Sequence, residues 1–170
     1  MPPWVRKFVL TAHIASTVGW LGAAASFLVL AVAGLTSDDT QLVRAVYLAG
    51  EPVTMFGIVP LSLASLLTGV IQSLGTPWGL FRHYWVLLKL GLTVFATIIL
   101  LQYTQTVTYF AGAASDVDGA GLDGLRSYIL HSGVGLLVLL TATTLSVYKP
   151  RGLTPYGWRK QQDQRKGIKG

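Results

Sequence analysis

The chain contains no cysteine among its 170 residues and only two methionines. Without cysteine there is no disulfide, no thiolate metal site and no attachment point for c-type haem, which needs a C-x-x-C-H motif. The two methionines also argue against a copper(I) pathway, because Cu(I) favours thiolate and thioether ligands. These absences exclude a disulfide-stabilised scaffold and argue against a soft-metal pathway.

Charged residues are also scarce, at 12% of the chain against roughly 25% in soluble domains. Hydrophobic residues make up 52%, and four stretches are long and apolar enough for a bilayer crossing of about 20 residues. Because open sheet edges cannot face lipid, each crossing should be a helix. We therefore predict an all-α polytopic membrane protein, with a four-helix transmembrane domain over residues 1–148 and a basic tail over residues 149–170. The predicted spans are residues 4–35, 42–74, 83–112 and 125–148.

Acidic and basic residues separate to opposite ends of this predicted up-down-up-down bundle. The basic side holds Arg6, Lys7, Arg82 and seven residues from Lys149 onward, opposed there only by Asp163. The other side holds most of the acids, namely Asp38, Asp39, Asp116, Asp118 and Asp123. The positive-inside rule then places both termini on the cytoplasmic side of a bacterial-type inner membrane. We expect the tail to be loosely ordered or to lie on the membrane, contacting anionic headgroups or a cytoplasmic partner rather than nucleic acid.

Away from the ends of the predicted spans, two pairs of ionisable residues stand out, because such residues are expensive inside a membrane and usually face the bundle interior. His13 and Lys89 lie at comparable depths in the first and third spans, which run in the same direction, so they form a predicted inner pair. Glu51 and His131 form a predicted outer pair near the opposite face. His13 and His131 are therefore poor partners for a single iron.

Threonines in line with Lys89 favour a polar cavity wall on the third span. Their spacing of four or seven residues follows one helical face, and the stripe comprises Lys89, Thr93, Thr97, Thr104 and Thr108. In the second span, Pro52 and Pro60 should bend the helix, since proline removes a backbone donor and clashes with the preceding turn. The row of Ser65, Gly69 and Ser73 is typical of close helix packing.

A histidine inside an apolar bundle makes haem the first cofactor to consider, because neutral histidine is its common axial ligand. We predict His13 as the metal ligand and His13, Trp20 and Lys89 as cofactor-binding residues, with haem b as the cofactor. Lys89 would ligate iron as a neutral amine, neutralise a propionate or hold an anionic substrate group. Further apolar lining is expected from Phe27, Phe56 and Phe95.

Two sequence segments add a resemblance to this picture. They are HIASTVGWLG (residues 13–22) and YWVLLKLGLTV (residues 84–94). Together they resemble the HemJ-type protoporphyrinogen oxidases, and the same layout is similar to the membrane domain of copper-resistance protein D. The resemblance implies a helical membrane protein that binds haem b, with His13 and Lys89 as its functionally important residues. It covers the first and third spans; after Gly22 the HemJ type has a P-R-L-x-V-Y-H-like stretch, where this chain reads AAASFLVLAVAG.

Three functional classes stay open at this point. The first is a haem- or porphyrin-binding protein, an oxidoreductase with Lys89 as its catalytic residue if it is an enzyme. The second is a small transport or copper-handling protein that uses the polar stripe. The third is a non-catalytic subunit of a membrane complex or a homo-oligomer, in which Lys89 snorkels to the interface and His13 is a hydrogen-bonded structural residue.

Overall fold

The computed structural model describes residues 1–75, 79–115, 122–150 and 152–167. Four helices in this part of the chain are long and apolar enough to cross a membrane, which confirms the prediction of four long apolar helices. They cover Pro3–Leu35, Thr40–Leu74, Tyr84–Ala114 and Gly124–Tyr148. Several residues used in the charge argument lie outside the described residues, namely Asp116, Asp118, Arg151 and Lys169.

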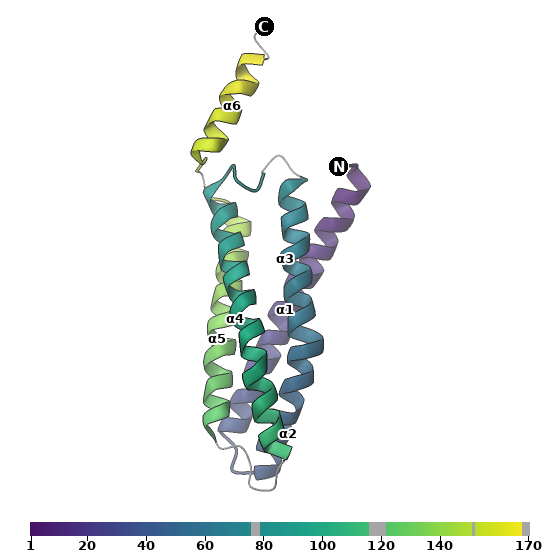
Figure 1. The fold of residues 1–170 in the computed structure, drawn as a ribbon, viewed down its shortest axis with the longest axis vertical. Helices are drawn as coiled ribbons and strands as arrows, with labels where there is room; N and C mark the ends of the chain where they lie inside the picture. Colours follow the sequence, from purple (N-terminus) through teal and green to yellow (C-terminus); the bar gives the residue numbers. More distant parts are fainter. Residues whose placement is uncertain (76–78, 116–121, 151, 168–170) are drawn as a thin grey trace.

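The first and third spans are long uninterrupted helices, α1 (Pro3–Leu35) and α4 (Tyr84–Ser115), and the fourth is α5 (Leu122–Tyr148). α1 begins with a proline in its first turn, where the missing N–H would have no helical partner anyway. Both termini lie at one end of the bundle (Figure 1). We call this the basic end, because Arg6 and Arg82 lie there, and the opposite end with Asp38 and Asp39 the acidic end.

The second span changes its helical geometry between its two prolines. It consists of α2 (Thr40–Pro52), a π-helical segment η1 (Val53–Ile58) and α3 (Val59–Leu74). At the end of η1 the N–H of Val59 bonds to the carbonyl of Thr54, five residues earlier. A wider turn here relieves the crowding that the ring of Pro60 creates in the preceding turn. The disturbance that we predicted as a bend is therefore a π segment.

The core is densest toward the acidic end. α1 packs on α3 and α5, while α2 packs on α4. Tyr128 on α5 lies at the centre of an aromatic cluster, with ring centroids 4.9 Å from Phe27, 5.4 Å from Tyr47 and 6.1 Å from Phe110. Toward the basic end, α3 and the first half of α1 diverge from α4 and α5 (Figure 1). The bundle is thus closed at its acidic end and splayed at its basic end.

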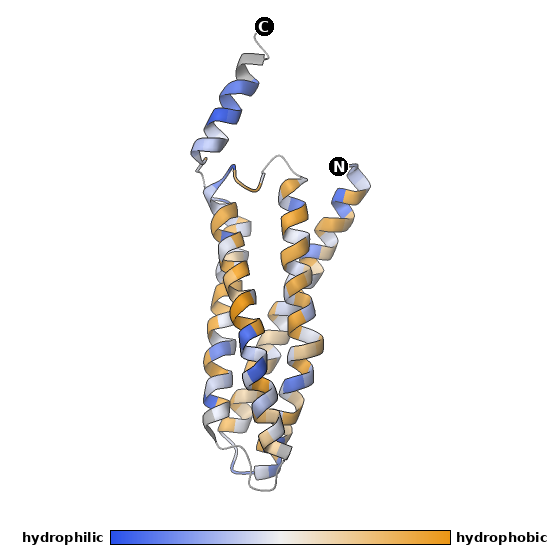
Figure 2. Ribbon diagram, viewed as in Figure 1, coloured by the Kyte–Doolittle hydropathy of each residue, from blue (hydrophilic) through white to orange (hydrophobic). Residues whose placement is uncertain are grey.

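A final helix, α6 (Pro155–Gly167), extends beyond the basic end, away from the bundle. It is hydrophilic along most of its length, in contrast to the spans (Figure 2). Thr154 anchors it, because its Oγ1 donates to the carbonyl of Phe81 at 2.5 Å and accepts from the N–H of Gly157 at 3.1 Å. The tail is thus helical over Pro155–Gly167 rather than loosely ordered. Its contact with the membrane surface stays a prediction.

Gly157 gives a test of this anchor. A Cβ at Gly157 would collide with the carbonyl oxygen of Arg82, whereas one at Gly152 would meet only an ordinary contact at 3.7 Å. We expect Gly157→Ala to displace α6 from the segment before α4. Trypsin should then cleave at Arg159 and Lys160 several times faster than in the wild-type protein, while Gly152→Ala should keep the wild-type rate. Equal rates in the two variants would contradict the anchor.

Candidate functional site

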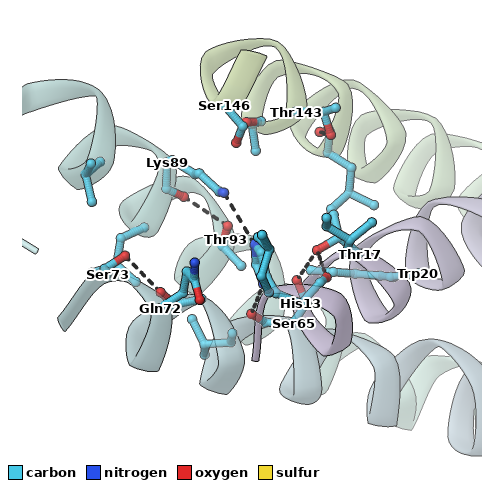
Figure 3. Close-up of a pocket in the computed structure, with 18 of the residues that line it drawn as sticks. His13, Thr17, Trp20, Ser65, Gln72, Ser73, Lys89, Thr93, Thr143 and Ser146 are labelled. Atoms are coloured by element: carbon cyan, nitrogen blue, oxygen red, sulfur yellow. Dashed lines mark hydrogen bonds between the residues drawn. The ribbon is translucent and has the colours of Figure 1, made fainter. Parts of the chain in front are cut away.

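A cavity of about 690 Å³ opens between α1, α3, α4 and α5 where the bundle splays (Figure 3). This volume lies within the usual range of ligand sites, roughly 300–1,000 Å³. Four ionisable residues line it, namely Arg6, His13, Lys89 and Lys149. The structure thus brings the predicted inner pair, His13 and Lys89, into one cavity.

The imidazole of His13 reaches from α1 to α3, where its orientation is fixed. Nδ1 lies 3.1 Å from the carbonyl oxygen of Ser65 and 3.1 Å from Oγ1 of Thr68. Because a carbonyl oxygen only accepts hydrogen bonds, Nδ1 carries the proton of the neutral ring. Nε2 therefore holds the lone pair, and it faces Nζ of Lys89 at 3.4 Å. This is the tautomer in which a histidine can bind a metal through Nε2.

Gly69 on α3 makes room for this ring. A Cβ at Gly69 would lie 3.1 Å from Cε1 of His13, tighter than an ordinary van der Waals contact. Next to it, Thr17 joins the two helices, since its Oγ1 donates to the carbonyl of His13 at 2.7 Å and lies 2.9 Å from Oγ of Ser65. From the sequence, the row of Ser65, Gly69 and Ser73 indicated close helix packing. It gave no sign that Gly69 makes room for the imidazole of His13.

Lys89 lies on α4 and is partly buried. Within the described part of the chain, Nζ has the imidazole of His13 as its hydrogen-bonding partner. The threonine stripe is less of a cavity wall than predicted, because only Thr93 lines the cavity beside Lys89. The hydroxyls of Thr93 and Thr97 donate to carbonyls one turn earlier, at 2.9 and 2.8 Å, so they are satisfied within their own helix.

The apolar part of the cavity differs from the predicted one. Trp20 lines it as expected and is only 4% exposed. Phe27 instead belongs to the aromatic cluster near the acidic end. Phe56 and Phe95 are 84% and 58% exposed, so they face outward from the bundle, toward lipid in a membrane. Their predicted place in the pocket was wrong. Which side of a helix faces the bundle interior depends on how the helices pack, and the sequence alone does not show this.

The predicted outer pair of Glu51 and His131 does not form among the described residues. The ring of His131 stacks on Tyr103 with centroids 3.7 Å apart, and its Nδ1 donates to the carbonyl of Ser127 at 2.9 Å. The hydroxyl of Tyr103 also lies 2.8 Å from Oγ of Ser127. Tyr103, which sequence reasoning did not single out, therefore takes the place we assigned to Glu51.

Gln72 is a second residue that sequence reasoning missed. It lines the cavity from α3, and its buried Oε1 has no hydrogen-bonding partner in the described structure. A buried acceptor without a donor is costly, so this atom marks a point on the cavity wall where a ligand donor would be favourable.

No family model, curated protein or solved structure matches this chain. Among the described residues, no three His, Cys, Asp or Glu side chains are grouped so that they could hold a metal ion. The resemblance to HemJ-type proteins accordingly stays a prediction, and the functional argument has to rest on the cavity.

Proposed function

We propose that this protein binds haem b, or a related porphyrin, in the cavity at the basic end of the bundle, with Nε2 of His13 as the axial ligand. One observation carries the proposal. Ser65 fixes the protonated Nδ1 of His13, so the lone pair of Nε2 faces a ligand-sized cavity. A ring held in this way is already oriented for metal binding before the metal arrives.

The residues fit a haem if Lys89 moves. A metal held by Nε2 of His13 would need the space beside this nitrogen that Nζ of Lys89 now faces. Nε2 and Nζ are 3.4 Å apart, so the ammonium has to withdraw from the ring. The flexible stem of lysine permits this movement. Trp20 would then contact the porphyrin, and Arg6 and Lys149 at the opening suit its propionates.

A bound haem supplies one-electron chemistry. The chain's own residues would hold and orient it, exclude water along the apolar wall, and offer the ammonium of Lys89 as a hydrogen-bond donor beside the ligand. If the protein is an enzyme, we propose a membrane oxidoreductase that acts on a hydrophobic tetrapyrrole or quinone-like substrate. Lys89 would be its catalytic residue because it is the ionisable group that faces His13 across the cavity.

We further propose that the protein lies in a bacterial-type inner membrane with its basic end facing the cytoplasm, as the positive-inside rule suggests. In that orientation α6 would project into the cytoplasm and present Arg159 and Lys160 to anionic headgroups or a cytoplasmic partner. The closed acidic end favours this ligand-binding function over transport. A path through the bundle would have to pass the aromatic cluster, in which Tyr47 and Tyr128 are 0% and 1% exposed.

Gly69 and Gly22 provide a matched test of the proposal. Gly69→Ala pushes on the imidazole, whereas a Cβ at Gly22 meets nothing within 4 Å. A side chain forced off its rotamer loses about 0.5–1.5 kcal/mol, so haem should bind Gly69→Ala roughly 2- to 10-fold more weakly than wild type. Titration of the detergent-purified apoprotein with haemin, followed at the Soret band, measures this. Affinities that are unchanged in Gly69→Ala, or equally reduced in Gly22→Ala, would contradict His13 as the ligand.

A further inference from the structure

We propose that the cavity opens sideways to the bilayer between α1 and α5, and that its substrate is a membrane-dissolved molecule whose hydrocarbon tail stays in this opening. We call the opening the α1–α5 seam, and its rim consists of Leu10, Ile14 and Val18 on α1 and Thr143 on α5. Of the two substrate classes in the proposed function, the inference selects the quinone-like one. It rests on the proposed function for the ring-shaped head of the substrate, but not for the seam itself.

The first observation is where the wall of the cavity is exposed. Leu10, Ile14 and Val18 line the cavity and are 42%, 54% and 62% exposed. Thr143, which lines the cavity from α5, is exposed as well. In contrast, every described lining residue of α3 and α4 is buried or partly buried. Besides its cationic rim at the basic end, the cavity is therefore open along the edge between α1 and α5.

The course of the two helices is the second observation. Toward the acidic end α1 and α5 pack closely, with the ring centroids of Phe27 and Tyr128 4.9 Å apart. Toward the basic end the first half of α1 diverges from α5 (Figure 1). Leu10, Ile14 and Val18 are spaced four residues apart, so they lie on one side of α1 over about 12 Å of the helix. The seam therefore runs along the helix axis, and the aromatic cluster closes one end of it.

The chemistry and depth of the rim are the third observation. The α1 side of the rim is entirely aliphatic. On α5, the hydroxyls of Thr143 and Ser146 donate to carbonyls one turn earlier at 2.8 and 2.9 Å, so a hydrocarbon can lie against them without leaving a donor unpaired. Both residues are labelled in Figure 3. Because Ile14 directly follows His13, this apolar rim lies at the same depth in the membrane span as the imidazole.

These observations favour a substrate that comes from the bilayer over one that comes from water. A water-borne ligand would enter at the basic end and has no use for an apolar opening beside His13. A ligand with a long tail needs such an opening, because its head can then reach the cavity while its tail stays in lipid. Since lipid is as apolar as the helix surface, the seam provides passage rather than affinity. A tailed quinone has this shape, whereas a flat tetrapyrrole has no tail to leave in the seam.

Narrowing the seam tests the inference, with an alkyl-tailed benzoquinone and its tailless parent as probes. In phosphatidylcholine liposomes, saturable quenching of tryptophan fluorescence reports binding, because Trp20 and Trp85 line the cavity. Added bulk in an occupied space should weaken binding of the tailed quinone to Ile14→Phe/Thr143→Phe by about 10-fold or more. The tailless quinone can still enter at the basic end, so its affinity should change by less than about twofold.

Ala15→Phe/Thr144→Phe is the matched control. Ala15 and Thr144 are the next residues along the same two helices, and both are exposed, but neither lines the cavity. This variant should bind both quinones as the wild type does. All variants should keep the wild-type size-exclusion profile; if the double seam variant does not, Thr143→Phe alone is compared with Thr144→Phe.

The outcomes separate this inference from the proposed function. Seam-dependent binding of the tailed quinone without a Soret band on addition of haemin would refute the proposed haem site and support the seam. Haem binding without saturable quinone binding would overturn this inference and leave the haem ligand intact. Equal loss of both quinones in the seam variant, unchanged binding of the tailed one, or the same loss in the control would also overturn it. So would a stoichiometric phospholipid, seen by native mass spectrometry, that the tailed quinone does not displace.

Discussion

His13→Ala should remove nearly all of the haem absorbance of the purified protein, whereas His83→Ala should leave it close to the wild-type value. The imidazole of His13 is the only one that lines the cavity among the described residues. His83 lies before α4, where its backbone bridges to Leu153 near the base of α6. Soret absorbance per mole of protein, measured after identical purification, compares the two variants.

Two controls distinguish loss of the haem ligand from loss of folding. Ser65→Ala keeps the backbone carbonyl that accepts from Nδ1 of His13, so it should retain most of the haem. Size-exclusion profiles of all variants in the same detergent should match that of the wild type. Equal loss of haem in His13→Ala and His83→Ala, or a Soret band that persists in His13→Ala, would refute the assignment of His13 as the ligand.

Tyr128→Ala should strongly destabilise the bundle, by roughly 3 kcal/mol, as large-to-small changes at buried aromatic residues do. Tyr128 is 1% exposed, its ring contacts Phe27 and Tyr47, and its hydroxyl donates to the carbonyl of Val107 at 3.4 Å. Because lipid is as apolar as the protein interior, most of this loss is packing around an empty volume rather than transfer to water.

Tyr148 is the matched control for this substitution, since it is the same residue type on the same helix but 79% exposed. Tyr148→Ala should change stability by less than about 0.5 kcal/mol. Thermal unfolding in detergent, followed by circular dichroism, distinguishes the two variants. A Tyr128→Ala midpoint within error of the Tyr148→Ala midpoint would show that the aromatic cluster does not hold the acidic end together.

The membrane spans could be predicted from the sequence because hydropathy and length are local properties of a chain. The His13–Lys89 pair could also be predicted, since both residues lie within spans that run in the same direction, and helical rise converts sequence position into depth. Depth alone did not predict the contacts of Glu51 and His131. Which side chains meet also depends on how each helix is rotated about its own axis. The stacking of His131 on Tyr103 follows from how α4 and α5 face each other.

Other features had a local signal that the prediction overlooked. Thr154 followed by Pro155 is a typical start of a helix, a capping residue before a proline in the first turn, and α6 begins there. Gln72 had no such signal, because an unsatisfied buried oxygen is a property of the assembled cavity wall. The outward facing of Phe56 and Phe95 likewise depends on which side of each helix the bundle buries.

The central claim is that a haem binds to His13, and the absorption spectrum of the wild-type protein tests it most directly. The protein would be purified in mild detergent from haem-replete cells, and spectra recorded in the oxidised and dithionite-reduced states. We predict a Soret band at near-stoichiometric amount that shifts on reduction and is lost in His13→Ala. A colourless wild-type protein would contradict the claim.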